Sequence, residues 1–128
     1  MDLVSIIIPY YKKKKYISTT INSAISQSYK NIEIIIVYDD ENYDDLKLIE
    51  EIKKKDERIK IIKNKKKMGA GLSRNIGISS STGNYIAFLD ADDTWEADKL
   101  SKQMSFMTDK NYLASHTSYQ IVDEYRNI

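Results

Sequence analysis

Three aspartates, Asp90, Asp92 and Asp93, follow an apolar run within four positions in the stretch YIAFLDADD. Two carboxylates about 4 Å apart repel by roughly 1 kcal/mol in water and by roughly 4 kcal/mol at an effective dielectric constant near 20, so folding must bring positive charge to them. A divalent cation would reverse the sign of the interaction. Hard Mg²⁺ or Mn²⁺ prefers oxygen ligands and commonly takes one or two carboxylates together with substrate phosphates. Asp90 and Asp92 therefore predict a metal site that holds a diphosphate; the alternative is a solvated acidic turn that caps the following helix.

Two other groups of residues could recognise a nucleotide. Asp39 ends a second apolar run, where its carboxylate could accept from the N3–H of a pyrimidine or from a ribose hydroxyl; the alternative is a turn or capping residue. Tyr10 and Tyr11 follow Pro9, and an aromatic ring that stacks on a base contributes about 1–3 kcal/mol. The alternative for the tyrosines is packing at a sheet edge, and we expect one of the two rings to do only that.

Basic residues and glycines lie between these aspartates in the sequence. Arg74 could bind a phosphate with its forked guanidinium, or form a surface ion pair on a helix. Gly69 and Gly71 supply permissive backbone, but they lack the third glycine of the dinucleotide-binding fingerprint and do not follow the first strand. The lysine runs 12–15 and 65–67 are typical of solvated loops. A minor role for these lysines in attracting phosphates or an anionic membrane surface stays open.

The pattern of apolar residues predicts alternating strands and helices that would position these side chains. Apolar residues at helical spacing alternate with short β-branched runs, which is typical of a parallel sheet with helices on both faces. The carboxyl ends of parallel strands meet at one edge, so we expect the aspartates, the tyrosines and Arg74 to converge there. We expect burial on both faces for the runs IEIIIV and YIAFL. The predicted strands are 4–9, 31–39, 58–63, 84–90 and 112–125, and the predicted helices are 16–27, 44–55, 71–80 and 97–110.

Bulk composition excludes several classes of protein. The chain has 128 residues, which predicts one domain over residues 1–128, and its net charge of +1 gives no reason to expect nucleic acid as a partner. The absence of cysteine excludes disulfides and thiolate zinc sites. The apolar runs are too short for a membrane-spanning helix, and no basic region precedes the first of them, so no signal peptide is expected. We expect a cytoplasmic chain, with peripheral contact at the inner face of the membrane left open.

In order and spacing, three stretches of the sequence resemble the family 2 glycosyltransferases. They are VSIIIPYY, INSAISQSYKNIEIIIVYD and MGAGLSRNIGISSSTGNYIAFLDADDTWEADKL. The resemblance covers residues 4 to about 103 and implies the GT-A fold, a Rossmann-like α/β fold for nucleotide-diphospho-sugar transferases, with its C-terminal part absent. It also implies transfer of a sugar from a nucleotide diphosphate, often UDP, to a hydroxyl of a glycan or lipid-linked acceptor. Many members of the family build bacterial surface polysaccharides.

The same resemblance implies roles for individual residues. Asp92 would be the direct ligand of Mn²⁺ or Mg²⁺, and Asp90 would hold the ribose or the water shell of the metal. Pro9 and Tyr11 match the family's Pro-x-Tyr at the base pocket. The implied nucleotide-binding residues are Pro9, Tyr11, Asp39, Arg74 and Asp90, and the implied metal-binding residues are Asp92 and Asp90.

Three departures from the family pattern affect these expectations. Residues 38–41 read YDDE where the family usually has DDGS, so Tyr38 takes the first aspartate position and the preference for base and ribose is open. Lys12 replaces the usual asparagine after Pro-x-Tyr. The family's catalytic base, an aspartate or glutamate, is expected beyond Ile128, so no residue of this chain is given that role.

Other functions fit the acidic stretch less well. DADDT matches the D-x-D-x-T of haloacid-dehalogenase-type phosphatases, in which the first aspartate is the nucleophile, but that motif belongs on the first strand and only 34 residues follow Thr94. A calcium loop is excluded because Trp95 and Ser101 stand where glycine and glutamate are required. A module that binds a nucleotide sugar and metal without turnover stays open.

Overall fold

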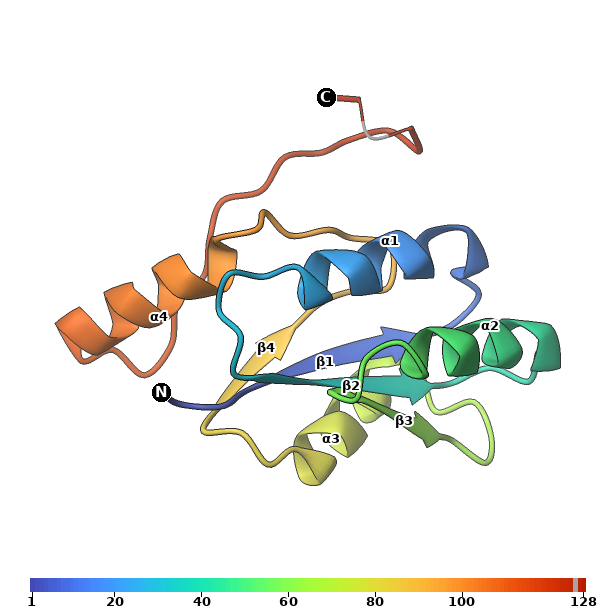
Figure 1. The fold of residues 1–128 in the computed structure, drawn as a ribbon. Helices are drawn as coiled ribbons and strands as arrows, with labels where there is room; N and C mark the ends of the chain where they lie inside the picture. Colours follow the sequence, from blue (N-terminus) through green and yellow to red (C-terminus); the bar gives the residue numbers. More distant parts are fainter. Residues whose placement is uncertain (126) are drawn as a thin grey trace.

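The computed structural model describes residues 1–125 and 127–128, which form four strands and four helices in strict alternation (Figure 1). All eight elements begin and end within two residues of their predicted bounds. In the described residues, no helix is both long and apolar enough to cross a membrane. The elements are β1 (Val4–Tyr10), α1 (Lys14–Ile25), β2 (Ile32–Tyr38), α2 (Tyr43–Lys53), β3 (Ile59–Lys63), α3 (Ala70–Ser80), β4 (Tyr85–Phe88) and α4 (Lys99–Lys110).

The strands form one parallel sheet in the order β3-β2-β1-β4. Helices α1 and α2 lie over one face and α3 lies under the other (Figure 1). The predicted α/β architecture with a parallel sheet is therefore confirmed. Because every pair of strands is parallel, the carboxyl ends of all four strands lie at the same edge of the sheet.

The two central strands carry most of the core. Successive side chains of a strand point to opposite faces, so Ile6 and Ile8 contribute to the core beneath α1, α2 and α4, and Ile7 packs beneath α3 with Ile35 and Val37. All five isoleucine and valine side chains are fully buried. Burial on both faces explains why β1 and β2 are almost continuously apolar.

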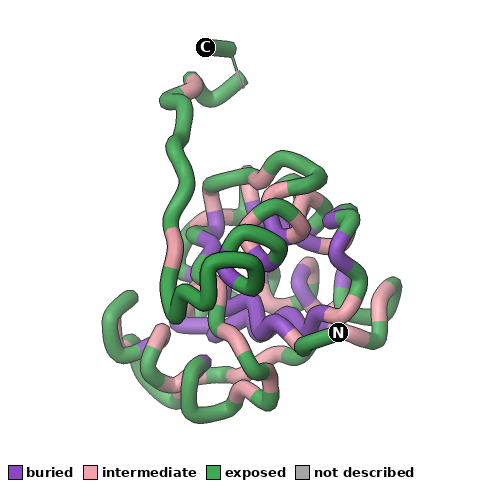
Figure 2. The backbone as a smooth tube through the Cα atoms, turned by 90° about the vertical axis from the view of Figure 1, so that its left-hand side faces the viewer, coloured by how far each residue is buried: buried purple, intermediate pink, exposed green. Residues whose placement is uncertain are grey.

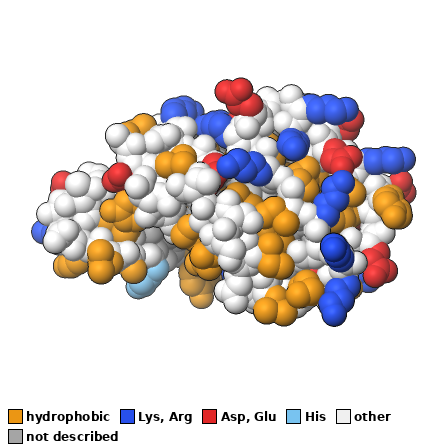
Figure 3. Space-filling model, turned by 90° about the horizontal axis from the view of Figure 1, so that it is seen from below, with side chains coloured by type: hydrophobic (Ala, Val, Ile, Leu, Met, Phe, Trp, Pro, Cys, Tyr) orange, Lys and Arg blue, Asp and Glu red, His pale blue; other side chains and the backbone are white. Residues whose placement is uncertain are grey.

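Strand β4 differs from this pattern. Ile86 and Phe88 are 37% and 50% exposed, so the prediction that this strand is buried on both faces is wrong. The register pairs Phe88 with Ile7, which places Phe88 on the α3 face, but α3 packs on β1 and β2 and does not extend over the sheet edge. Viewed from the α3 side, hydrophobic side chains accordingly reach the surface (Figure 3).

Residues 112–125, all of which the structure describes, contain no strand, so the prediction of a strand there is wrong. A strand needs the free edge of a neighbour to satisfy its backbone groups, and this segment runs past α1 instead of along the sheet (Figure 1). It is mostly exposed (Figure 2). Lys15 contacts it through an ion pair of 2.5 Å with Glu124 and through the ring of Tyr125. Leu113, Tyr119 and Ile121 stay more than 80% exposed.

Helix α3 approaches β1 closely at Gly77. A Cβ atom at this position would lie 2.5 Å from Cγ2 of Ile7, whose side chain is fully buried. Gly77→Ala should therefore lower the free energy of unfolding by about 1–3 kcal/mol, because a packed core absorbs an added methyl group only with strain. Urea unfolding measures this. The matched control is Gly71→Ala in the same helix, where the added Cβ meets nothing within 4 Å; stability there should stay level or rise by up to about 1 kcal/mol.

A buried carboxylate joins the amino-terminal ends of the strands to the segment before β4. Glu33 accepts hydrogen bonds from the Ser5 hydroxyl at 2.5 Å, from the Thr82 N–H at 2.6 Å and from the Lys60 ammonium at 2.6 Å. Burial alone would raise the pKa of Glu33, but these hydrogen bonds outweigh it and lower the pKa to about 2.

This shift predicts a pH dependence of stability. A carboxyl group whose pKa is lower in the folded chain stabilises the fold above its unfolded pKa near 4.5, and that contribution disappears as the pH falls towards 2. Glu33→Gln should be less stable than the native chain by on the order of 2–3 kcal/mol at pH 6, and the difference should shrink between pH 4.5 and pH 2. Urea unfolding of both proteins over this range is the measurement; a difference that does not vary with pH would contradict the assignment.

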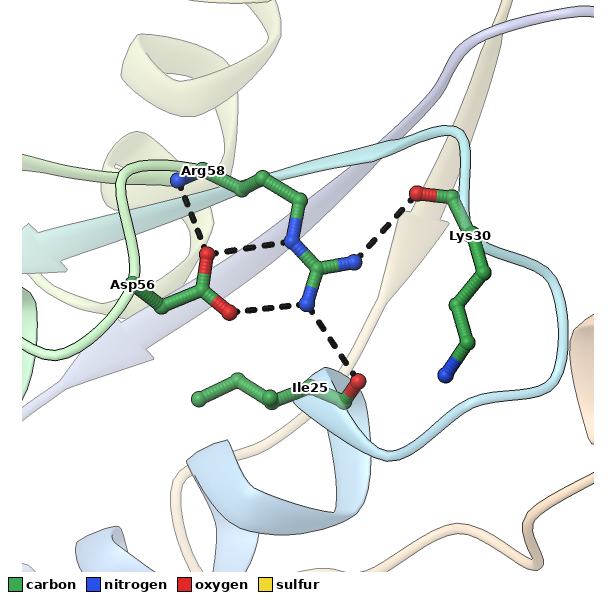
Figure 4. Close-up of polar contacts among 4 residues, drawn as sticks. All are labelled: Ile25, Lys30, Asp56 and Arg58. Carbon is green, nitrogen blue, oxygen red and sulfur yellow. Dashed lines mark hydrogen bonds and ion pairs between the residues drawn. The ribbon is translucent and has the colours of Figure 1, made fainter.

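Arg58 ties three segments together at the edge of the sheet opposite to the carboxyl ends (Figure 4). Its guanidinium forms a two-pronged pair with Asp56, with N–O distances of 3.0 and 2.7 Å, and donates to the carbonyl oxygens of Lys30 and Ile25. The hydrogen bonds from Arg58 lower the pKa of Asp56. The end of α1, the segment before β2 and the turn before β3 are thus held by one side chain.

Candidate functional site

A pocket of about 390 Å³ opens at the carboxyl edge of the sheet. Its walls come from the ends of β1, β2 and β4 and from the first two turns of α3. The structure brings all six sequence-predicted site residues together here. The lining residues are Pro9, Tyr10, Tyr11, Lys13, Asp39, Lys67, Gly69, Ala70, Ser73, Arg74, Asp90, Ala91 and Asp92.

Asp39, at the end of β2, is only 3% exposed and organises the segment before α3. Its Oδ1 accepts from the Asn64 side chain at 2.9 Å and from the Met68 N–H at 2.7 Å. Its Oδ2 accepts from the Gly69 N–H at 2.8 Å. A carboxylate has about four lone-pair positions, so Oδ2 keeps capacity for one further donor.

Gly69 allows the chain to turn into α3. Its φ of +87° lies in the left-handed region, which a residue with a Cβ adopts only with strain, and it occupies the N-cap position of the helix. Ala70 and Ser73 then line the pocket from the first turn. The amino-terminal end of a helix carries partial positive charge, so this wall favours an anionic group.

The two tyrosines after Pro9 have different surroundings. Tyr10 is fully buried, donates its hydroxyl to Asp45 at 2.6 Å and stacks on the ring of Tyr38 with centroids 5.2 Å apart. Burial is the main cause that raises the pKa of Tyr10, and burial likewise raises the pKa of Tyr38 to about 12. Tyr38, the departure from the family pattern, is therefore a core residue. Tyr11 is the ring left at the surface, 36% exposed.

Two lysines flank the Tyr11 ring. The Lys67 ammonium lies 3.6 Å from the ring centroid and the Lys12 ammonium lies 5.2 Å from it. Hydrogen bonding to Lys12 and then to Lys67 lowers the pKa of the Tyr11 hydroxyl. Lys12 itself has a φ of +49°, a conformation in which asparagine is favoured over lysine, and its N–H donates to Asp40 at 3.0 Å.

The acidic residues after β4 are paired with basic side chains. Arg74 donates to Asp90 Oδ1 at 2.8 Å, and Lys13 lies 3.0 Å from Asp92 Oδ2. The sequence-based reasoning assigned the relief of carboxylate repulsion to a divalent cation. In the folded chain, two cationic side chains of the protein also bring positive charge to these carboxylates. Both pairs are about half exposed, which limits their contribution to stability to about 1 kcal/mol or less each.

The carboxylates of Asp90 and Asp92 fit Mn²⁺ or Mg²⁺ when a phosphate completes the coordination of the cation. Asp90 and Asp92 supply hard oxygen atoms, and such cations complete their coordination with phosphate oxygens and water. Within the described residues, no group of three or more His, Cys, Asp or Glu side chains could hold a metal ion. The pocket therefore suits a cation that arrives with a phosphate ligand, rather than a metal held by protein ligands alone.

Sequence reasoning did not assign individual roles to three pocket residues, Lys13, Lys67 and Ser73. The two lysines belong to runs that favour solvated loops, and only some members of each run line the pocket. The available signals were that Lys13 lies in the connection between the first strand and the first helix, and that Lys67 lies two residues before the N-cap glycine of α3.

The sequence of this chain is similar to those of known glycosyltransferases. The sequence profile described as "Glycosyl transferase family 2" matches residues 5–127. An uncharacterized glycosyltransferase of Rickettsia felis is 44% identical over 121 residues, covering 94% of this chain and 20% of that protein. The Escherichia coli protein named UDP-Glc:alpha-D-GlcNAc-diphosphoundecaprenol beta-1,3-glucosyltransferase WfaP is 45% identical over 125 residues, covering 98% of this chain and 49% of that protein. The chain thus spans from a fifth to half of the length of these relatives.

Solved structures share the fold. Staphylococcus aureus TarS 1–349, in complex with UDP-GlcNAc, superposes with a TM-score of 0.78 at 25% identity and covers 84% of this chain and 32% of that one. The mannosyltransferase PcManGT of Pyrobaculum calidifontis, in complex with GDP-Man and Mn²⁺, gives a TM-score of 0.77 at 17% identity and covers 83% of this chain and 32% of that one. The α/β fold of this chain is the GT-A fold of these transferases.

Proposed function

Because this chain belongs to glycosyl transferase family 2, we propose that it forms the donor-binding domain of an enzyme that transfers a sugar from a UDP-sugar to an acceptor hydroxyl. The observation that carries the proposal is the convergence of Tyr11, Asp39, Arg74, Asp90 and Asp92 on one pocket. We take residues 1–128 as a single domain. The name of the Escherichia coli relative supports a lipid-linked sugar as acceptor, and the complex of the Staphylococcus aureus protein supports UDP as the nucleotide of the donor.

The nucleoside end of the donor lies at β1 and β2. Tyr11 presents an exposed ring on which a base can stack, and Asp39 Oδ2 has capacity for the N3–H of uracil. Pro9 forms part of the same wall. Because the Asp39 carboxylate is fixed by three hydrogen bonds, it needs no rearrangement to accept a fourth.

The diphosphate end lies at β4 and α3. Arg74 and Lys13 stand beside the carboxylates, where their positive charge can orient phosphate oxygens, and the helix end adds to the same field. Asp92 and Asp90 would hold Mn²⁺ or Mg²⁺, which when bound supplies positive charge against the charge of the leaving diphosphate. Arg74 and Lys13 each release a carboxylate oxygen if they turn to the phosphates.

The general base and the acceptor site are not assigned to this chain. Three hydrogen bonds leave the Asp39 carboxylate with one free lone pair, which the proposal assigns to the nucleobase. Asp90 and Asp92 are assigned to the diphosphate. We propose that the base, an aspartate or glutamate, belongs to the part of the longer relatives that this chain does not match.

A thermal-unfolding panel of nucleotides tests the proposal. UDP and a UDP-sugar should stabilise the chain in the presence of Mn²⁺, by about 2.7 kcal/mol when the ligand is at a hundred times its dissociation constant. ADP and CDP should stabilise it far less, and Mn²⁺ alone should have little effect. Equal stabilisation by all nucleotides, or none by UDP, would contradict the proposal; binding without transfer in an activity assay would favour a binding module.

A further inference from the structure

Lys67 lies at the nucleoside end of the pocket, in the segment between β3 and α3. The two residues that follow it, Met68 and Gly69, are fixed through their N–H groups by Asp39. The backbone next to Lys67 is therefore anchored at the group that the proposed function assigns to the base. Its side chain is exposed, and its ammonium rests 3.6 Å from the centroid of the Tyr11 ring.

The strand order separates Lys67 from the other cations of the pocket. Neighbouring strands lie about 4.8 Å apart, so the ends of β2 and β4, with β1 between them, are roughly 10 Å apart. Arg74 and Lys13 pair with carboxylates at the β4 side. Lys67 enters from the β3 side, and among the described residues it has no ion pair with a carboxylate. It is the cation placed to meet a base rather than a diphosphate.

Two hydrogen-bonding groups of opposite kind thus line the same pocket as the Tyr11 ring. Asp39 Oδ2 offers one remaining lone pair, which accepts a ring N–H. The Lys67 ammonium offers donors on a flexible stem. An acceptor next to a donor is complementary to a base that carries a ring N–H beside a carbonyl oxygen. Uracil has this pair, whereas cytosine and adenine carry a bare ring nitrogen that the Asp39 carboxylate would repel.

We propose that Lys67 is a specificity-determining residue that leaves the Tyr11 ring when a nucleotide binds and donates to O4 of uracil, the carbonyl oxygen beside the N3–H accepted by Asp39, at the position where cytosine carries an amino group. The inference rests on the proposed function and adds a residue to it. A cation over an exposed ring contributes about 0.5–1 kcal/mol, and the stacked base, at about 1–3 kcal/mol, replaces that contact. Guanine carries the same N–H and carbonyl pair, so Lys67 separates these bases from cytosine and adenine rather than uracil from guanine.

The test measures the binding of uridine, UDP and CDP to the chain, by NMR titration and calorimetry, for the native protein and for Lys67→Met. The variant should bind uridine and UDP about ten-fold more weakly, by the same factor, because the lost hydrogen bond is to the base. Its preference for UDP over CDP should shrink about ten-fold. Lys67→Arg should restore most of the affinity, and Lys66→Met, an exposed neighbour outside the pocket, should change nothing.

Each other outcome has a separate meaning. Weaker binding of UDP with unchanged binding of uridine would place Lys67 at the phosphates and overturn the inference. Unchanged or tighter binding of all three ligands would show that Lys67 only competes with the base for the ring, and would also overturn it. If the native chain binds neither uridine nor UDP, the proposed function itself fails, which the native titration alone reveals.

Discussion

In an Asp92→Ala variant, the affinity for UDP should no longer rise when Mn²⁺ is added. Asp92 presents a carboxylate at the end of the pocket that we propose for the diphosphate, where a divalent cation needs an anionic oxygen from the protein. We expect the Mn²⁺-dependent part of the affinity to fall by roughly 100-fold or more, since loss of even a supporting group around a metal costs about 10–100-fold. Calorimetry with UDP in Mn²⁺ and in EDTA gives both affinities.

The fold should tolerate this change. Asp92 pairs with Lys13 at 3.0 Å with both side chains about 40% exposed, and such a pair contributes about 1 kcal/mol or less to stability. Asp93→Ala is the matched control, because it removes the same charge one position later from a residue that does not line the pocket. Mn²⁺-dependent binding that survives in Asp92→Ala would rule out Asp92 as the ligand.

Replacing Asp39 with alanine should lower both the stability of the chain and its affinity for uridine. The Met68 and Gly69 N–H groups would lose their acceptor, and an unsatisfied, partly buried donor costs about 1–3 kcal/mol. We expect a loss of about 2–4 kcal/mol, which for a domain of this size lowers the melting temperature by roughly 10 °C. Uridine should bind at least about ten-fold more weakly, and pyrophosphate should lose less.

A neighbouring carboxylate provides the control for this substitution. Glu41 is exposed and lies two residues further on, so Glu41→Ala should leave both the melting temperature and the affinity unchanged. Thermal unfolding followed by circular dichroism and NMR titration with uridine measure the two effects separately. An Asp39→Ala chain that melts and binds like the native protein would show that the hydrogen bonds to the α3 segment carry little free energy.

The convergence of the site was predictable because it depends on topology alone. Once Val4–Tyr10, Ile32–Tyr38 and Tyr85–Phe88 are parallel strands, Tyr11, Asp39 and Asp90 must meet at one edge. The long runs of isoleucine in the first two strands favour burial on both faces, as in a parallel sheet covered by helices.

The sequence does not predict features that depend on where each helix or segment ends in space. Whether Phe88 is covered depends on the extent of α3 over the sheet, which helix periodicity does not encode. Whether residues 112–125 pair as a strand depends on whether they lie along an edge of the sheet, which their alternation of apolar residues does not reveal. The pairing of Lys13 with Asp92 joins residues nearly 80 positions apart, so only the folded chain shows it.

The order of the strands allows substitutions at one end of the pocket to act independently of the other end. The proposed base-contacting groups come from the ends of β1 and β2 and from the segment after β3, and the two carboxylates proposed for the diphosphate end follow β4. Changes at sites more than about 7–10 Å apart with no shared partners usually combine additively. On the proposed assignment, a lineage can change the nucleobase that it accepts through positions such as Lys67 without changing the carboxylates proposed for the diphosphate.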